Sequence, residues 1–174
     1  DMFSIATTNM ILRGDGQSNL ICEDFLAQDP GELQLSGGGI TVGFMNPPYS
    51  QAKNKDTANL SELCFIRHLL NSITEGGRAA VIVPVSAMIG KTKEDKAIKK
   101  EILKNHTLEG VISLNKDTFY RVGTVPCIAV FTTGIPHPTE KKAKFINFED
   151  DGYEVKKHLG LVETERAKDK RQYL

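Results

Sequence analysis

The chain has 174 residues, of which 40% are hydrophobic and 25% charged, enough for one domain with a core. Its 22 Lys and Arg residues balance 22 Asp and Glu residues, so no global field attracts a polyanion. These figures exclude a histone-like binder, and since no apolar run approaches about 18 residues, we expect no membrane span and no membrane partner.

The amino-terminal part predicts one helix and two strands. Residues 1–12 carry apolar side chains on a helical face, and Arg13-Gly14 supplies a stop. The apolar run at 19–25 predicts a strand, and a second strand is expected at 40–45. Asn46-Pro47-Pro48-Tyr49 ends that second strand, because two prolines cannot continue a central ladder.

The rest of the chain alternates between helix and strand patterns. We expect helices at 60–73 and 93–104, and strands at 79–83, 108–114, 126–132 and 144–148. The run at 79–83 is wholly apolar, which is typical of a parallel strand buried on both faces. The alternation predicts an α/β domain with a mainly parallel sheet over residues 1–148, followed by a polar extension over 149–174.

Three cysteines, Cys22, Cys64 and Cys127, lie far apart. An odd number without short spacing argues against a disulfide framework and a zinc knuckle. We therefore expect small buried hydrophobes in a cytoplasmic protein. Cys64 and His68 are spaced like a pair of metal ligands on a helix, but no further ligand pattern accompanies them, so no metal site is expected.

The strongest chemical signal is the Asn46-Pro47-Pro48-Tyr49 segment, which follows a predicted buried strand. Open α/β sheets bind ligands at the carboxyl ends of their strands. The Asn46 side-chain oxygen and a proline carbonyl can jointly accept hydrogen bonds from a planar amine, and the Tyr49 ring can stack on a flat π system. This pattern is suited to alkylating a weakly nucleophilic nitrogen. The alternative is a plain strand-ending turn with a packed tyrosine.

The segment resembles the catalytic motif of amino-group methyltransferases that use S-adenosylmethionine. Further stretches resemble the modification subunits of type I restriction systems: residues 9–14, 19–24, 77–84, 108–114 and 119–131. The resemblance covers most of residues 1–148. It implies a Rossmann-like methyltransferase fold with three αβα layers. It also implies methyl transfer to the N6 amine of adenine in double-stranded DNA, with specificity and restriction subunits as partners.

The resemblance also implies roles for particular residues. Asn46 and Pro47 would hold the amine, Pro48 would shape the loop, and Tyr49 would stack on an adenine flipped out of the duplex. Asp24 and Phe25, together with Asn46, match contacts to the cofactor. Phe119 is a candidate second wall of the base pocket, although packing near a turn is the more common use of such a residue.

The chain departs from the family pattern in its cofactor site. No G-x-G pattern follows a strand, since Gly37-Gly38-Gly39 precedes one, and the acid that would hold the cofactor ribose is missing. The chain therefore resembles a catalytic domain without its first two strands, and we expect weak or no S-adenosylmethionine binding by the chain alone. Two alternatives stay open: a methyltransferase acting on protein glutamine or RNA, and a non-catalytic docking piece of a larger assembly.

Overall fold

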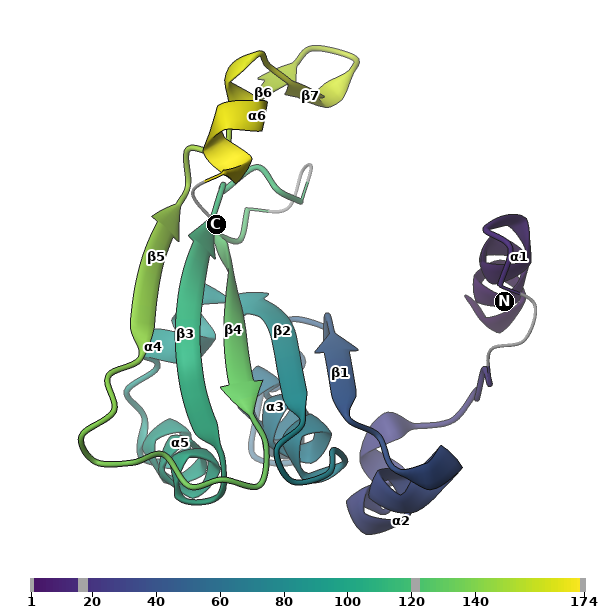
Figure 1. Cartoon of the computed structure of the whole chain (residues 1–174), viewed down its shortest axis with the longest axis vertical. Helices are drawn as coiled ribbons and strands as arrows, with labels where there is room; N and C mark the ends of the chain where they lie inside the picture. The colour runs from purple at the N-terminus through teal and green to yellow at the C-terminus, as the bar shows by residue number, and fades with distance from the viewer. Residues whose placement is uncertain (1, 16–18, 120–122, 173–174) are drawn as a thin grey trace.

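A five-stranded sheet forms the centre of the computed structural model, which describes residues 2–15, 19–119 and 123–172 (Figure 1). The strands lie in the order β1-β2-β4-β3-β5. Their bounds are Val42–Met45 for β1, Arg78–Pro84 for β2, Thr107–Leu114 for β3, Pro126–Thr132 for β4 and Lys144–Phe148 for β5. All five were predicted, and β2 and β4 occupy inner positions, as their apolar sequences require.

The sheet is mainly parallel, as predicted. β1 pairs with β2 and β3 pairs with β5 in parallel, whereas β4 is antiparallel to both of its neighbours. Four strands therefore point in one direction and share a carboxyl edge, where Asn46 to Tyr49 follow β1. The α/β fold class is confirmed.

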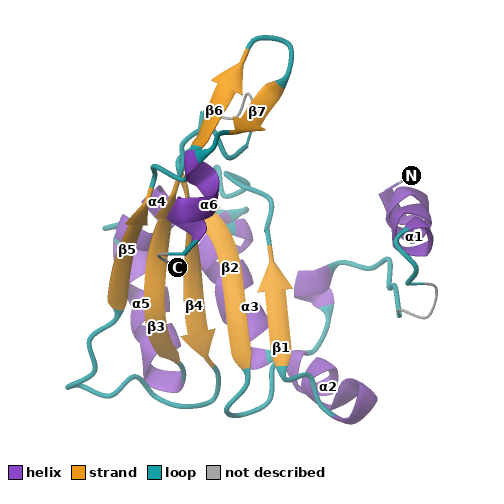
Figure 2. Cartoon of the chain, turned by 45° about the horizontal axis from the view of Figure 1, so that its top comes forward, coloured by secondary structure: helices purple, strands orange, loops and turns teal. Residues whose placement is uncertain are grey.

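Three helices lie against one face of the sheet (Figure 2): α3 (Glu62–Asn71), α4 (Val85–Ile89) and α5 (Lys93–Asn105). Ser61 caps α3, and Thr92 and Asp95 form a reciprocal capping box at the start of α5. The core between these helices and the sheet includes Ile66, Leu70, Val81, Ala129 and Phe131. On the opposite face, Phe44 of β1 is 81% exposed.

One glycine sets how closely α3 approaches β1. A Cβ atom on Gly43 would lie 2.6 Å from Ile73 Cδ1 and 3.0 Å from Leu69 Cδ1. Any larger residue would push the helix away from the strand, so Gly43 fixes the position of the Asn46 loop relative to the core.

The amino-terminal region packs poorly. The predicted helix forms as α1 (Met2–Leu12), but it contains no buried residue. The predicted strand at 19–25 is wrong, because none of the described strands lies beside it to complete a ladder, and a 3₁₀ turn at Phe25–Ala27 ends the segment. Cys22 is exposed for the same reason, so its predicted burial is also wrong, whereas Cys64 and Cys127 are buried. An additional short helix, α2 (Pro30–Leu35), begins where Asp29 caps Gly31.

The carboxyl-terminal extension forms a small unit of its own. β6 (Tyr153–Lys156) and β7 (Gly160–Glu163) make an antiparallel hairpin, which is followed by α6 (Arg166–Arg171). Figure 1 shows this unit beyond the carboxyl ends of β3 and β5. Across the described ranges, no helix combines the length and apolar character needed to cross a membrane.

Candidate active site

The Asn46 to Tyr49 segment leaves β1 at the carboxyl edge of the sheet. Asn46 and Pro48 are exposed, Pro47 is buried, and Tyr49 is partly buried. Among the described residues, no hydrogen bond engages the Asn46 side chain or the Pro47 carbonyl. Two acceptor groups therefore stand at the end of a rigid strand, and prolines contribute no competing N–H donor there.

The Tyr49 side chain is held at two places. Its hydroxyl donates a hydrogen bond to the Ile82 carbonyl on β2, with an oxygen–oxygen distance of 3.2 Å. Its ring contacts the Phe119 ring edge to face, with centroids 6.1 Å apart and an interplanar angle of 70°. Burial, followed by the charges of Cys127 and Glu62, raises the pKa of Tyr49, so the hydroxyl stays protonated and remains a donor. The structure thus brings together the two residues proposed as walls of a base pocket.

The loop after Tyr49 is anchored by Glu62, which sequence reasoning missed. Ser50 adopts a left-handed backbone with φ of 56°, and its N–H donates to Glu62 Oε1 at 2.7 Å. Gln51 Nε2 donates to the Tyr49 carbonyl at 3.0 Å. Ser61 and Glu62 form a recognisable helix start in the sequence. That pattern does not reveal which loop N–H donates a hydrogen bond to the Glu62 carboxylate.

Asn115 organises the turn that carries Phe119 and was also missed. Its side-chain oxygen accepts from the Asp117 N–H at 2.9 Å, and its carbonyl accepts from the Thr118 hydroxyl at 2.6 Å. This turn directly follows β3, so Phe119 reaches Tyr49 from another strand end at the same edge. An Asx turn was available as a sequence signal.

Asp24 and Phe25 stand at the start of the 3₁₀ turn that precedes α2. Asp24 Oδ1 caps the 3₁₀ turn by accepting from Leu26 N–H at 3.0 Å. The Phe25 ring packs edge to face on His68 of α3, with centroids 4.6 Å apart. Among the described residues, no hydrogen bond or ring contact connects either side chain to Asn46 or Tyr49. The cofactor role of Asp24 and Phe25 therefore stays a prediction.

Cys64 and His68 have structural surroundings. The Cys64 thiol points to the Ala58 carbonyl at 3.9 Å, and His68 packs against Phe25. Burial lowers the pKa of His68, which favours its neutral form. The part of the chain that the structure describes contains no group of three potential metal ligands.

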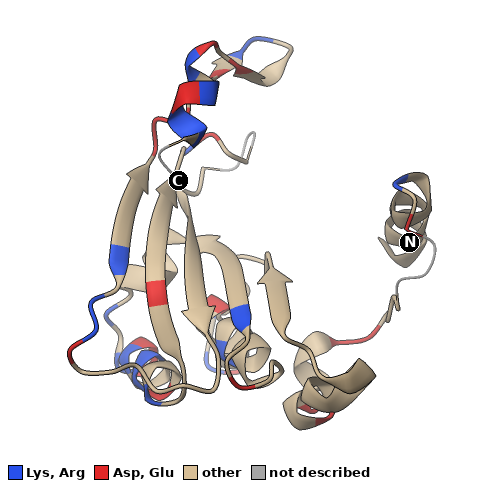
Figure 3. Ribbon diagram, viewed as in Figure 1, with Lys and Arg blue, Asp and Glu red and all other residues tan. Residues whose placement is uncertain are grey.

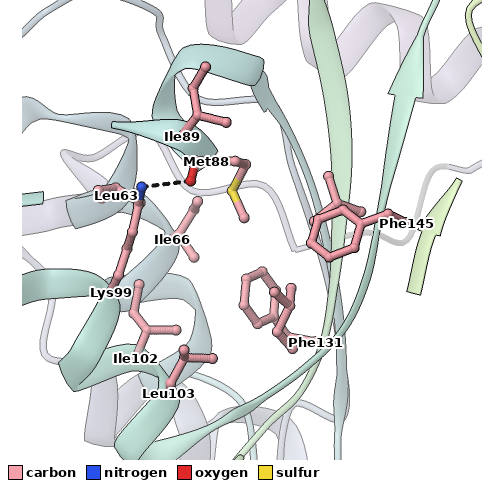
Figure 4. A pocket seen from close by; sticks show the side chains of 11 residues that line it. Leu63, Ile66, Met88, Ile89, Lys99, Ile102, Leu103, Phe131 and Phe145 are labelled. Atoms are coloured by element: carbon pink, nitrogen blue, oxygen red, sulfur yellow. Dashed lines mark hydrogen bonds between the residues drawn. The ribbon is translucent and has the colours of Figure 1, made fainter. Parts of the chain in front are cut away.

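An apolar cavity of about 330 Å³ lies on the helical face of the sheet (Figure 4). Its wall includes Ile66, Met88, Ile102 and Phe131, and Lys99 Nζ donates to the Met88 carbonyl at 2.6 Å. Burial lowers the pKa of Lys99. None of the residues from Asn46 to Tyr49 lines this cavity, so it is separate from the candidate active site.

Comparison with known families decides the family of the chain. The profile of the family described as N-6 DNA Methylase matches residues 2–173. The chain belongs to this family. The match includes the Asn46 segment, both ends of the sheet and most of the carboxyl-terminal extension.

Two curated relatives come from restriction-modification systems. The chain is 56% identical, over 99% of its length, to 27% of a type II restriction enzyme and methyltransferase, RM.BcgI, of Heyndrickxia coagulans. It is 29% identical, over 75% of its length, to 23% of the type I restriction enzyme EcoKI methylase subunit of Escherichia coli K12. The chain thus spans about a quarter of these relatives, and the similarity to modification subunits inferred from sequence is confirmed.

A solved structure confirms the fold. The type I restriction-modification methyltransferase subunit from Streptococcus thermophilus matches with a TM-score of 0.71 at 19% identity, covering 98% of this chain and 39% of that one. At this identity the match shows the fold alone. It includes the extension, so the hairpin and α6 are part of the shared architecture.

Proposed function

We propose that this chain supplies the amine-holding part of a methyltransferase that modifies the N6 atom of adenine in DNA, within a restriction-modification system. The observation that carries the proposal is the free pair of acceptors, the Asn46 side chain and the Pro47 carbonyl, at the carboxyl end of β1. Membership of the N-6 DNA Methylase family supports the same reaction.

The chemistry follows from hydrogen-bond geometry. An exocyclic amine has two N–H groups and a lone pair that is delocalised into the ring. When the Asn46 side chain and the Pro47 carbonyl accept hydrogen bonds from the two N–H groups, electron density returns to the nitrogen. Its lone pair then turns toward an electrophile. Positive charge develops on the nitrogen as the new carbon–nitrogen bond forms, so both acceptors stabilise the transition state more than the ground state.

Capture of the base is assigned to Tyr49 and Phe119. A base in a duplex is stacked and paired, so it must leave the helix before its amine can reach Asn46. The two rings contact each other at 6.1 Å and come from different strand ends, which makes an aromatic corner suited to a flat base. Stacking on aromatic side chains is worth about 1–3 kcal/mol per base.

The methyl donor is proposed as S-adenosylmethionine, because the sequence resembles methyltransferases that use it and a solved structure from Listeria monocytogenes with a similar fold carries that donor in its name. Asp24 and Phe25 remain the proposed contacts to its adenine, but among the described residues no hydrogen bond or ring contact joins them to Asn46, and no G-x-G pattern follows a strand in the sequence. We therefore propose that residues 1–174 do not hold the cofactor by themselves and are inactive alone.

The proposed partners are double-stranded DNA and the specificity and restriction subunits of a type I system. The type I name of the Escherichia coli relative supports this assembly. The Heyndrickxia relative instead combines a restriction enzyme and a methyltransferase in one name, which supports restriction activity in the same protein. Purification of the native complex and identification of its subunits by mass spectrometry separates these arrangements.

Product analysis tests the proposed reaction. The complete protein that carries residues 1–174 is incubated with labelled S-adenosylmethionine and duplex DNA, RNA or a glutamine-containing peptide. We expect the label in N6-methyladenine after nuclease digestion of the DNA. Label in peptide glutamine or only in RNA would contradict the proposal in favour of the other enzyme class, and no transfer to any substrate would favour a non-catalytic docking role.

A further inference from the structure

The tip of the β6–β7 hairpin is positively charged. Lys156, Lys157, His158 and Leu159 are all exposed, and the described residues offer neither lysine a carboxylate partner. Figure 3 shows Lys and Arg positions in blue along the ribbon at this end of the molecule. The nearest acid along the strand, Glu154, lies two ladder positions from Lys156 on the same strand face.

Three other cations of the extension are ion-paired, whereas Lys168 of α6 has no ion pair among the described residues. Arg166 and Lys170 both pair with Asp150, at 3.2 and 2.7 Å, and Arg171 pairs with Glu163. Ion pairs thus occur at the base of the unit, and Lys156 and Lys157 lie unpaired at its outer end. Exposed cations without a carboxylate partner attract a polyanion.

The hairpin is held firmly at its base, although an isolated two-stranded hairpin is only marginally stable. Gly152, with φ of 81°, packs so closely on the buried Ala167 of α6 that an added Cβ would lie 2.6 Å from the Ala167 Cα. Arg171 donates to the Tyr153 hydroxyl at 2.9 Å. The tip therefore has a fixed direction.

A hydrogen bond connects this unit to the candidate base pocket. Asn115 Nδ2 donates to Asp151 Oδ1 at 3.0 Å, and the same oxygen accepts from the Tyr153 N–H that opens β6 at 2.9 Å. Asn115 is also the residue that organises the turn carrying Phe119. One side chain thus fixes the hairpin and the aromatic corner relative to each other, at the same edge of the sheet.

We propose that the tip of the hairpin, residues 156–159, binds the phosphate backbone of the DNA duplex beside the adenine received by Tyr49 and Phe119. The inference rests on the proposed function, because it adds a duplex contact to that site. Lysines suit this role, since compact ammonium groups on flexible stems follow phosphates regardless of base sequence. A fixed contact beside the pocket would keep the flanking duplex in place while one base leaves it.

Salt-dependent binding tests the inference. Fluorescence anisotropy measures the affinity of the complete protein for duplex DNA between low and physiological salt. Replacing Lys156 and Lys157 together by Gln removes two phosphate contacts, so the slope of log K against log salt should become shallower by about 1.8. The matched control is Lys96→Gln with Lys100→Gln, two exposed lysines on α5 away from the carboxyl edge, and its slope should stay at the wild-type value. Lys156→Arg with Lys157→Arg should also keep it.

The outcomes separate the two proposals. Methylation of adenine by the wild type, with an unchanged slope in the hairpin variant, overturns the hairpin contact and leaves the proposed function standing. An equal reduction of the salt slope in the α5 control also overturns the hairpin contact, because the effect would then not be specific to the hairpin. A wild type that neither binds duplex nor methylates it overturns both. A hairpin-dependent slope without methylation supports the duplex contact and removes the proposed reaction.

Discussion

The core and the amino-terminal region of this chain differ in how they are held. Helix α3 buries Leu63, Ile66, Leu70 and other residues against the sheet, whereas α1 and α2 bury none. The residues of the predicted active site differ in the same respect. Asn46 and Tyr49 extend from the packed sheet and Phe25 packs against the core through His68, whereas Asp24 is exposed. Most of the stability of a helix, and the position of a side chain, come from tertiary packing, which α1 lacks.

The largest expected contrast is in stability. Leu70→Ala in residues 1–174 removes a fully buried side chain and should lower the free energy of unfolding by about 2–5 kcal/mol. Ile5→Ala in the exposed helix α1 should change it by less than about 0.5 kcal/mol, because no packing is lost there. Urea denaturation measures both. Equal losses would show that α1 is packed as firmly as the core.

The second contrast concerns catalysis by the complete protein. Asn46→Ala removes an acceptor that acts as charge develops, so the single-turnover rate should fall by on the order of 10²-fold or more while DNA affinity stays unchanged. Asn46→Asp keeps an acceptor oxygen and should retain part of the activity. Tyr49→Ala should instead weaken capture of the base, seen by 2-aminopurine fluorescence. An unchanged rate in Asn46→Ala contradicts the proposed chemistry.

A smaller effect is expected from the loop anchor. Glu62→Ala leaves the Ser50 N–H without its acceptor, and loss of a charged hydrogen bond of about 1.5 kcal/mol corresponds to roughly a tenfold drop in kcat. Glu62→Gln retains an acceptor oxygen and should restore most of the rate, with the KM for DNA unchanged in both variants. If Glu62→Ala changes only thermal stability, the anchor has no positioning role.

The smallest expected effect is a pH dependence of the folding stability that arises from His106 in the core. His106 is buried, with its Nδ1 accepting from the Gly134 N–H at 3.0 Å and its Nε2 bonded to Asn71 Oδ1 at 3.0 Å, so the neutral ring fits. Burial lowers its pKa. Because the unfolded chain binds the proton more readily, the stabilisation is complete above about pH 6.5 and is lost as pH falls through the folded pKa.

Urea midpoints between pH 7.5 and pH 5 measure this loss. The pKa of His68 is lowered as well, so His106→Gln isolates the contribution of His106. The variant should be less stable at neutral pH but should lose less stability on acidification than the wild type. If the wild type and the His106→Gln variant lose the same stability between pH 7.5 and pH 5, a group other than His106 causes the pH dependence.

Much of the core could be predicted from sequence, because its signals are local and agree with one another. The apolar runs at 79–83 and 126–132 predicted inner strands, and both are inner strands. The run at 19–25 looked equally strand-like but has no neighbour to pair with, and pairing is not encoded in a single segment. The carboxyl-terminal hairpin was missed because its strands are only four residues long, and its attachment to α6, through Gly152 on Ala167 and the Arg171–Glu163 ion pair, is not visible in a single segment.

Some features of the candidate active site could likewise be predicted from sequence, and others could not. The position of Asn46 follows from its place at a strand end, and the meeting of Tyr49 with Phe119 follows from two strands that share an edge. The bond of Glu62 to the Ser50 N–H and that of Asn115 to Asp151 could not be predicted, since each joins segments that are far apart in the sequence, whereas the local Asx turn of Asn115 left a readable signal. Likewise, the packing of Phe25 on His68 required the structure.

Calorimetric titration of S-adenosylmethionine into residues 1–174 tests the central claim most directly, namely that this chain contains the amine-holding half of the site but not the cofactor-holding half. We predict a dissociation constant weaker than about 10 μM, or a binding free energy less favourable than about −6.8 kcal/mol. Tighter binding that is abolished by Asp24→Ala would contradict the account, because it would show that Asp24 and Asn46 form one cofactor site within this chain.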